Sequence, residues 1–427
     1  MIRRRLALPL MLLAACAAFG SFGVSAKGAD NKSLLTDGLL NPRGIKVGPD
    51  GMLYVAEAGT GGTTQFHTEH DDVLTGNTGR ISKIDPATGV RTTVVDGLPS
   101  YVGNNPADDP SAFGVADLAF LDNTLYYLRT GGTLHFPGLP NGIYRVNKDG
   151  TSKLLADVGA FTKANPTLAV KNGQEDVDPE GNPYSMLVRG RSFYVVDGNQ
   201  NQVIEVTESG KISRLADFPE HEVTTGIASK DGGPLFVSTL GPEKPGKVYQ
   251  VGFPTGLITQ IAGGVPQLTG LAFGPGGGLY ADSFAAPADD PNGPPVKIGS
   301  GGIFKVNDDG TMSKIVTGFT AGTTFTFIGD TAYILNDSVN AFGTGEVWKV
   351  ENFSSIAPQP PDSETPPPPP APPTPDASKK PVGVKPPDTG SGPTGGSGDA
   401  MPIFALAIAA ATLGVAVIGG GYATRRR

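Results

Sequence analysis

The sequence has very little cysteine, histidine and tryptophan, and its charge is sparse and on balance negative. Its 427 residues include one Cys, four His and one Trp, with a net charge of −8 at pH 7. The only cysteine, Cys16, lies in an apolar N-terminal run, so a chain cut after that run has no disulfide. An acidic balance gives no reason to expect a nucleic-acid partner, because binding to phosphates needs a basic patch. G-x-S-x-G, H-E-x-x-H and Walker motifs are also missing, so no common catalytic motif assigns a reaction.

Glycine and proline are abundant, at 61 and 39 residues, and they separate short β-like runs. Each run is rich in β-branched or aromatic residues and is too short for a helix. Within residues 44–98 the runs are Gly44–Val47, Met52–Glu57, Arg80–Asp85 and Arg91–Val95. Four strands joined by tight turns predict a small antiparallel meander.

The second and third of these runs recur five times each further along the chain. Copies of the second run are Leu125–Arg129, Phe193–Asp197, Leu235–Thr239, Leu279–Ser283 and Ala332–Asn336. Copies of the third run are Gly142–Asn147, Gln202–Thr207, Lys247–Gly252, Gly302–Asn307 and Glu346–Val350. A four-strand unit that repeats every roughly 45–70 residues is typical of a β-propeller blade. The counts therefore predict an all-β, six-bladed β-propeller.

The fourth run indicates how the ring closes. It has five copies, and the sixth unit ends at Trp348-Lys349-Val350 without one. A matching segment stands at the other end of the domain, where Leu34–Leu39 (LLTDGL) resembles Val94–Leu98 (VVDGL). We expect this N-terminal strand to complete the sixth blade, because closure removes an open sheet edge.

The N-terminal end predicts export. Residues 1–26 have the features of a signal peptide: a basic start, an apolar run, and the small residues Val24-Ser25-Ala26 at the cleavage site. Leu13-Ala14-Ala15-Cys16 also fits a lipoprotein box, which is an alternative. Residues 27–355 are then the propeller domain.

The C-terminal end predicts a membrane anchor. Residues 356–400 form a Pro/Gly/Ser-rich linker, an extended stalk, and 401–423 are an uncharged run long enough for one C-terminal transmembrane helix. Residues 424–427, with three arginines, are the expected cytoplasmic basic tail, which places the propeller on the extracytoplasmic cell surface. Pro387-Asp388-Thr389-Gly390 resembles a sortase signal, with processing between Thr389 and Gly390; a plain membrane helix is the alternative.

Three segments of the domain resemble the ScyD/ScyE family of secreted, NHL-like propellers. They are Gly38–Gly62, Asn182–Leu187 and Tyr194–Asn201. The similarity extends from about Leu34 to Phe353 and implies a six-bladed propeller without an established reaction. It makes Asn182, Pro183 and Tyr184 candidate family-motif residues.

The long insertions all fall on one predicted face, which we call the loop face. This face carries the connections from second to third strands and those between blades. Its insertions are Thr60–Gly79, Pro99–Ser111, Thr130–Asn141, Gly159–Pro183 and Ala285–Gly301. The opposite side, the turn face, has only short connections. Insertions gathered on one face of a repeat ring usually mark its binding face.

The loop face also holds the candidate metal ligands. His67, His70 and Asp71 are a candidate site for a divalent metal, calcium or zinc, with a solvated polar loop as the alternative. Acidic runs at Asp108–Asp109, Glu175–Asp178 and Asp289–Asn292 allow the same two interpretations.

A polar residue ends each of the six predicted second strands. These residues are Glu57, Arg129, Asp197, Thr239, Ser283 and Asn336. One interpretation is a polar ring at the mouth of the central channel. The other is that each side chain caps its own strand-to-loop turn, since every blade must satisfy the same backbone groups.

Two functions remain open from the sequence. The first, which we prefer, is a cell-surface binding or scaffold module that presents the loop face to an unknown extracellular ligand or protein. The second is an extracellular metal-dependent hydrolase, similar to six-bladed lactonases, with Glu57, Asn182, Asp197 and Asn336 converging at the channel mouth.

Overall fold

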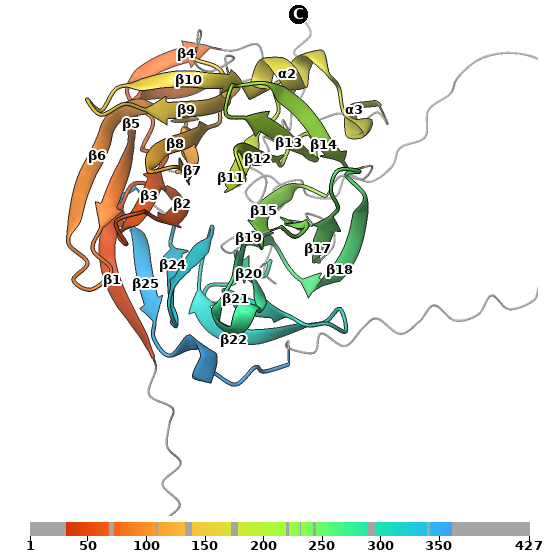
Figure 1. The fold of residues 1–427 in the computed structure, drawn as a ribbon. Coiled ribbons are helices and arrows are strands. Elements are labelled where there is room, and N and C mark those ends of the chain that lie inside the picture. The colour runs from red at the N-terminus through yellow and green to blue at the C-terminus, as the bar shows by residue number, and fades with distance from the viewer. Residues whose placement is uncertain are drawn as a thin grey trace, which may run out of the picture.

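The computed structural model is a ring of six antiparallel β-sheets around a central axis (Figure 1). It describes residues 31–67, 72–106, 110–132, 139–171, 178–218, 222–230, 232–241, 245–287, 296–339 and 342–360. The first strands of neighbouring blades contact one another in the cyclic order β2, β7, β11, β15, β19 and β23, so they surround the axis. The predicted all-β, six-bladed β-propeller is confirmed.

The strands follow the predicted runs closely. Blade one contains β2 (Pro42–Val47), β3 (Leu53–Glu57), β4 (Thr64–His67), β5 (Asp72–Ile84) and β6 (Arg91–Gly103). Blade two contains β7 (Val115–Leu121), β8 (Thr124–Arg129), β9 (Gly142–Val146) and β10 (Ser152–Asp157). Blade three contains β11 (Pro183–Arg189), β12 (Ser192–Asp197), β13 (Gln202–Thr207) and β14 (Ile212–Asp217).

The remaining three blades repeat this order. Blade four contains β15 (Thr224–Ser229), β16 (Leu235–Thr239), β17 (Gly246–Val251) and β18 (Ile258–Val265). Blade five contains β19 (Leu268–Phe273), β20 (Leu279–Ser283), β21 (Gly301–Val306) and β22 (Met312–Phe319). Blade six contains β23 (Phe325–Ile328), β24 (Thr331–Asn336), β25 (Gly345–Val350) and the N-terminal strand β1 (Lys32–Leu39).

The ring is closed by the N-terminal strand, as the sequence predicts. β1 pairs antiparallel with β25 and forms the outer edge of blade six, where Figure 1 shows the two strands side by side. Leu39, at the end of β1, is fully buried in the apolar cluster between blades six and one. Closure therefore combines a backbone ladder with a buried anchor.

Apolar side chains fill the spaces between neighbouring blades. Between blades two and three, for example, the rings of Tyr126 and Phe193 pack with their centres 4.7 Å apart. Near the axis the backbones come too close for side chains. A Cβ on Gly226 would lie 2.7 Å from the carbonyl carbon of Gly270, so glycine is required there.

The long connections follow second strands or join neighbouring blades, so all of them lie on the same face of the ring. This agrees with the expected loop face. Two insertions have secondary structure that the sequence did not indicate. β4, β5 and β6 extend blade one outward where only a loop was expected. The connection between β10 and β11 contains α2 (Val158–Ala164) and α3 (Leu168–Lys171). The short 3₁₀ segments are Pro275–Gly277 and Phe353–Ser355.

The expected signal peptide, linker, transmembrane helix and basic tail lie outside the described residues. Among the residues that are described, no helix has the length and apolar character needed to cross a membrane.

Candidate functional site

Glu57 ends the second strand of blade one, and its carboxylate is fully buried. The Leu40 N–H and the Arg80 guanidinium each donate to its Oε2 at 2.7 Å, and Ser82 Oγ donates to Oε1. Leu40 lies at the entry to the blade, just after β1. The carboxylate thus ties the end of β3 to the chain segment that enters the same blade.

Asp197 has the same arrangement in blade three. Its Oδ1 accepts hydrogen bonds from the backbone N–H groups of Asn182 at 2.7 Å, Gln200 at 3.1 Å and Asn199 at 3.2 Å. Its Oδ2 accepts one from Gln202 Nε2 at 3.0 Å. Burial raises the pKa of Asp197 above its ordinary value, while these hydrogen bonds act in the opposite direction.

The other four ring positions also make contacts at the ends of their own blades. Arg129 donates to the carbonyl oxygens of Leu139 and Pro140; Thr239 Oγ1 accepts from the Lys247 N–H at 3.1 Å. Ser283 Oγ donates to the Pro266 carbonyl at 2.7 Å, and Asn336 Oδ1 accepts from the Thr320 N–H at 2.8 Å. Arg129 and Thr239 thus contact the connection that follows their own strand, whereas Ser283 and Asn336 contact the segment that enters their own blade. A common role for the six at the channel mouth stays a prediction.

Of the four residues considered for a hydrolase site, the structure joins two. The backbone N–H of Asn182 donates to Asp197 Oδ1, whereas the Asn182 side-chain oxygen accepts from Thr130 Oγ1; Pro183 lies opposite Asp197 in the strand pairing. Glu57 is bonded within blade one, and Asn336 donates from Nδ2 to Glu346 Oε2 at 2.7 Å within blade six. The contacts of Glu57 and Asn336 thus belong to their own blades.

The candidate metal ligands are only partly described. His67 Nδ1 lies 2.6 Å from Asp72 Oδ1, and the two side chains are 70% and 45% exposed. His70 and Asp71 lie outside the described residues, as do most of the acidic runs. Within the part of the chain that the structure describes, no three His, Cys, Asp or Glu side chains are grouped to hold a metal ion. Metal binding in this insertion stays a prediction.

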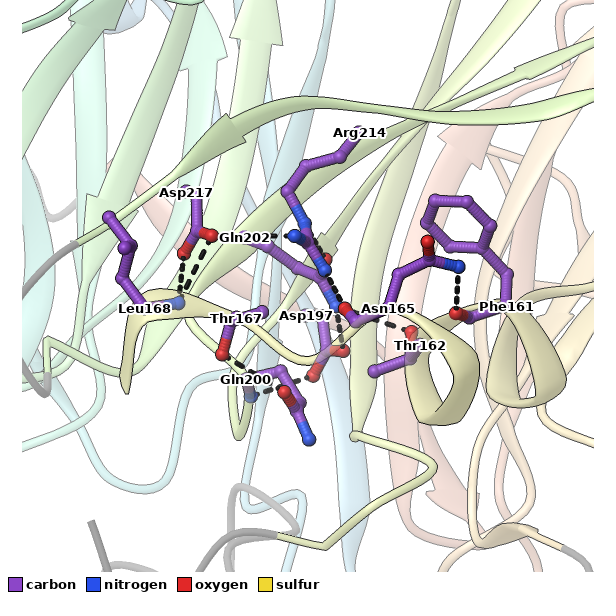
Figure 2. Close-up of polar contacts among 10 residues, drawn as sticks. All are labelled: Phe161, Thr162, Asn165, Thr167, Leu168, Asp197, Gln200, Gln202, Arg214 and Asp217. Atoms are coloured by element: carbon purple, nitrogen blue, oxygen red, sulfur yellow. Dashed lines mark hydrogen bonds and ion pairs between the residues drawn. The ribbon is translucent and has the colours of Figure 1, made fainter. Parts of the chain in front are cut away.

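A polar network fixes the helical insertion onto blade three (Figure 2). The Leu168 N–H donates to both carboxylate oxygens of Asp217 at 3.1 Å, and Arg214 donates to the Asn165 carbonyl. Arg214 Nε also donates to Gln202 Oε1 at 2.7 Å. Gln202 in turn donates to Thr162 Oγ1 at 3.2 Å, inside α2. The network thus runs from the strand ends of blade three into the insertion.

Asp197 belongs to this network through Gln202, its neighbour across the turn. The turn residues Asn199, Gln200 and Asn201 are at most 2% exposed, although all three are polar. Gln200 Oε1 accepts a hydrogen bond from Thr167 Oγ1 at 3.0 Å. The sequence showed Asp197 as a strand end but gave no sign of its partners, which are backbone N–H groups of its own turn and of Asn182, together with the Gln202 side chain.

A second candidate site is a cavity of about 290 Å³ on the propeller axis, lined by the first strands of all six blades. Its lining includes Lys46, Ser229 and Thr326 near the turn face, all partly exposed, and the buried Thr269 and Thr323 near the loop face. We call it the axial cavity. The exposure of its lining indicates that it opens on the turn face.

Charged and hydroxyl groups line the axial cavity. Lys46 Nζ lies 3.0 Å from Asp117 Oδ2, which also accepts from the Met186 N–H at 2.8 Å. Burial raises the pKa of Asp117, although the Lys46 charge lowers it. Burial likewise raises the pKa of Tyr184 well above its usual range. Arg43 and Tyr184 line both this cavity and a smaller one of about 20 Å³, so they form the boundary between the two.

These axial residues, apart from Tyr184 as a motif position, were not predicted from the sequence. The sequence nevertheless contains a sign of buried polar groups at the axis, because Asp117 and Asp282 lie inside mostly apolar strands (VADLAFL and LYADS). A charged residue is seldom fully buried without a specific role or partner. Asp282 is fully buried beside the axis, and burial raises its pKa well above the usual range.

The protein is thus a six-bladed β-propeller, and its central axis contains a cavity large enough for a small molecule. No family model matches the sequence, and no curated protein was found to be similar to it. The resemblance to the ScyD/ScyE family therefore stays an expectation from the sequence.

Solved structures with a related fold include two enzymes that act on sugars or sugar lactones and one lyase. A gluconolactonase from Xanthomonas campestris is 14% identical with a TM-score of 0.47, covering 74% of this chain and 88% of that chain. A PQQ-bound aldose sugar dehydrogenase from Streptomyces coelicolor is 13% identical with a TM-score of 0.47, covering 75% and 97%. Virginiamycin B lyase from Staphylococcus aureus is 14% identical with a TM-score of 0.41, covering 74% and 97%. Likeness at this level assigns no activity, substrate or cofactor to the chain.

Proposed function

We propose that the protein is a cell-surface binding or scaffold module that presents its loop face to an extracellular partner. The observation that carries this proposal is the helical insertion between β10 and β11, fixed by the network around Gln202 and Arg214. Fixing the backbone of each residue costs about 1–2 kcal/mol of conformational entropy, and most connections in compact domains are far shorter. An insertion whose described residues, 158–171 and 178–182, are held against blade three is therefore better explained by binding than by connection alone.

The anchoring part of the proposal rests on the sequence. A signal peptide, a linker of residues 356–400 and an apolar segment at 401–423 put the ring outside the cell at the end of a tether. With β1 and β25 in one blade, the tether begins beside blade six, where the described chain leaves the 3₁₀ turn at Phe353–Ser355. A tethered ring has its whole loop face available to a partner.

The hydrolase alternative has less support from the residues first considered for it. Both oxygens of Asp197 and of Glu57 accept hydrogen bonds from protein donors, which occupies lone pairs that a metal or a water would need. These carboxylates are accounted for as turn-stabilising groups.

Site-specific photo-crosslinking of the full chain on intact cells tests which face meets a partner. Ile298 on the loop face and Leu257 on the turn face are a matched pair, since both are large apolar side chains and are 75% and 68% exposed. A photoreactive residue at position 298 is expected to give a discrete crosslinked product, and the same residue at 257 is not. A product from 257 alone, or from neither position, would contradict the proposal.

A further inference from the structure

The axial cavity is a separate feature from the loop face, and its size suits a small molecule. Ligand pockets usually measure about 300–1,000 Å³, so a cavity of about 290 Å³ lies just below that range and suits a ligand of few atoms. Its opening lies among the short turns, where a macromolecule would find no insertions.

The charges on the wall favour an anion. β2 contributes two cations, Arg43 and Lys46, and the carboxylate on the lining is Asp117. Asp117 is already held by Lys46 and by the backbone N–H groups of Met186 and Leu118. The wall therefore has one more positive than negative charge, although the protein as a whole has a net charge of −8.

The rest of the wall offers hydroxyl groups. Tyr184, Thr324 and Thr326 all line the cavity, and none of these hydroxyls has a hydrogen-bond partner among the residues that the structure describes. The Tyr184 hydroxyl is completely buried, so it does not face the space that a ligand enters. Thr324 and Thr326 are partly exposed, and a ligand hydroxyl placed in the cavity would pair with them.

We propose that the axial cavity binds a small carboxylate that also bears hydroxyl groups. The ligand enters from the turn face, its carboxylate lies against Arg43 and Lys46, and its hydroxyl groups pair with those of Thr324 and Thr326. A charge-assisted hydrogen bond to the guanidinium supplies the strongest single contact. This site is independent of the loop face, so either proposal can fail without the other.

Calorimetric titration of the full chain with three four-carbon probes tests the proposed chemistry. Threonate carries one carboxylate and three hydroxyl groups. Threitol replaces the carboxylate with a hydroxymethyl group, and butyrate keeps the carboxylate without hydroxyls. Threonate is expected to bind at least tenfold more tightly than either of the others. No measurable binding of threonate, or equal affinity for all three, would overturn the proposal.

Variants locate the binding in the cavity. Thr326→Tyr fills the cavity and is expected to abolish threonate binding, whereas Thr92→Tyr, on the exposed outer strand β6, is the matched control and is expected to leave it unchanged. Arg43→Met is expected to weaken binding at least tenfold, with partial retention in Arg43→Lys. Thermal melting of each variant confirms that it is folded. Undiminished threonate binding to folded Thr326→Tyr would place the ligand elsewhere and refute the proposal.

Discussion

Leu34 in the first strand lies directly opposite Trp348 in the last, so the two ends of the ring belong to one sheet. The pairing continues from Lys32 opposite Val350 to Leu39 opposite Gly345. Without β1, the N–H and C=O groups of β25 would be left along an open edge. The stability of the whole ring is thus coupled to a short N-terminal segment.

Leu39→Ala is expected to lower the free energy of unfolding by about 2–5 kcal/mol, because Leu39 is fully buried between blades six and one. Leu34→Ala is the matched control on the same strand. Leu34 is 44% exposed, and its loss is expected to change stability by about 0.5 kcal/mol or less. Denaturant unfolding of both variants checks the pair. Equal effects would show that closure does not depend on the buried anchor.

Asp282→Asn is expected to stabilise the protein at neutral pH by at least about 1 kcal/mol, because the neutral amide removes the cost of keeping a buried carboxyl protonated and each unit of pKa shift is worth about 1.4 kcal/mol. Asp282 Oδ1 has no hydrogen-bond partner among the described residues, and the pKa of the carboxyl is raised well above its usual range by burial. The folded chain therefore holds a proton that the unfolded chain releases. Stability from this group is full below the unfolded pKa and is lost as the pH rises toward the folded pKa.

The pH dependence provides the check. Between about pH 4, near the ordinary pKa of aspartate, and pH 7, the parent protein should lose more stability than Asp282→Asn does. The exposed Asp308→Asn is the control and should behave as the parent. If Asp282→Asn is destabilised at pH 7, a binding partner for the ionised carboxylate must exist.

Arg214→Met is expected to loosen the helical insertion while leaving the blades folded. Arg214 connects Gln202 to the Asn165 carbonyl, so its loss removes one of the links between blade three and the segment after α2, while the bonds of Leu168 to Asp217 and of Thr167 to Gln200 remain. Hydrogen exchange should increase at α2 and α3 (Leu168–Lys171) and stay unchanged in β19 and β20. Arg145→Met, at an exposed position of β9, is the control. An equal increase throughout the domain would mean that Arg214 supports the whole fold.

The blades and their closure are predictable because their signals are local. Each strand is a short alternating run bounded by Gly or Pro. When the four-strand units are counted, the last unit lacks its fourth strand and the N-terminal segment has no unit of its own, so the two are expected to pair. The contacts between blade three and the helical insertion are not predictable in this way, since Gln202 and Thr162 meet only after the insertion folds back.

The axial cavity escaped prediction for a related reason. Lys46 and Asp117 belong to different blades and form an ion pair only because the ring brings β2 and β7 together. Tyr184 was identified as a motif residue, but its position on the axis depends on the curvature of six blades. Sequence periodicity gives the number of blades and leaves open which side chains meet at the centre.

Hydrogen exchange of the full chain, recorded alone and with isolated cell envelopes, tests the central claim about the loop face. The account predicts protection in the helical insertion (residues 158–171) and at residues 296–300. The short turns at residues 252–257 and 274–278 should exchange at the same rate in both samples. Protection confined to those short turns, with the insertion unchanged, would contradict a binding role for the loop face.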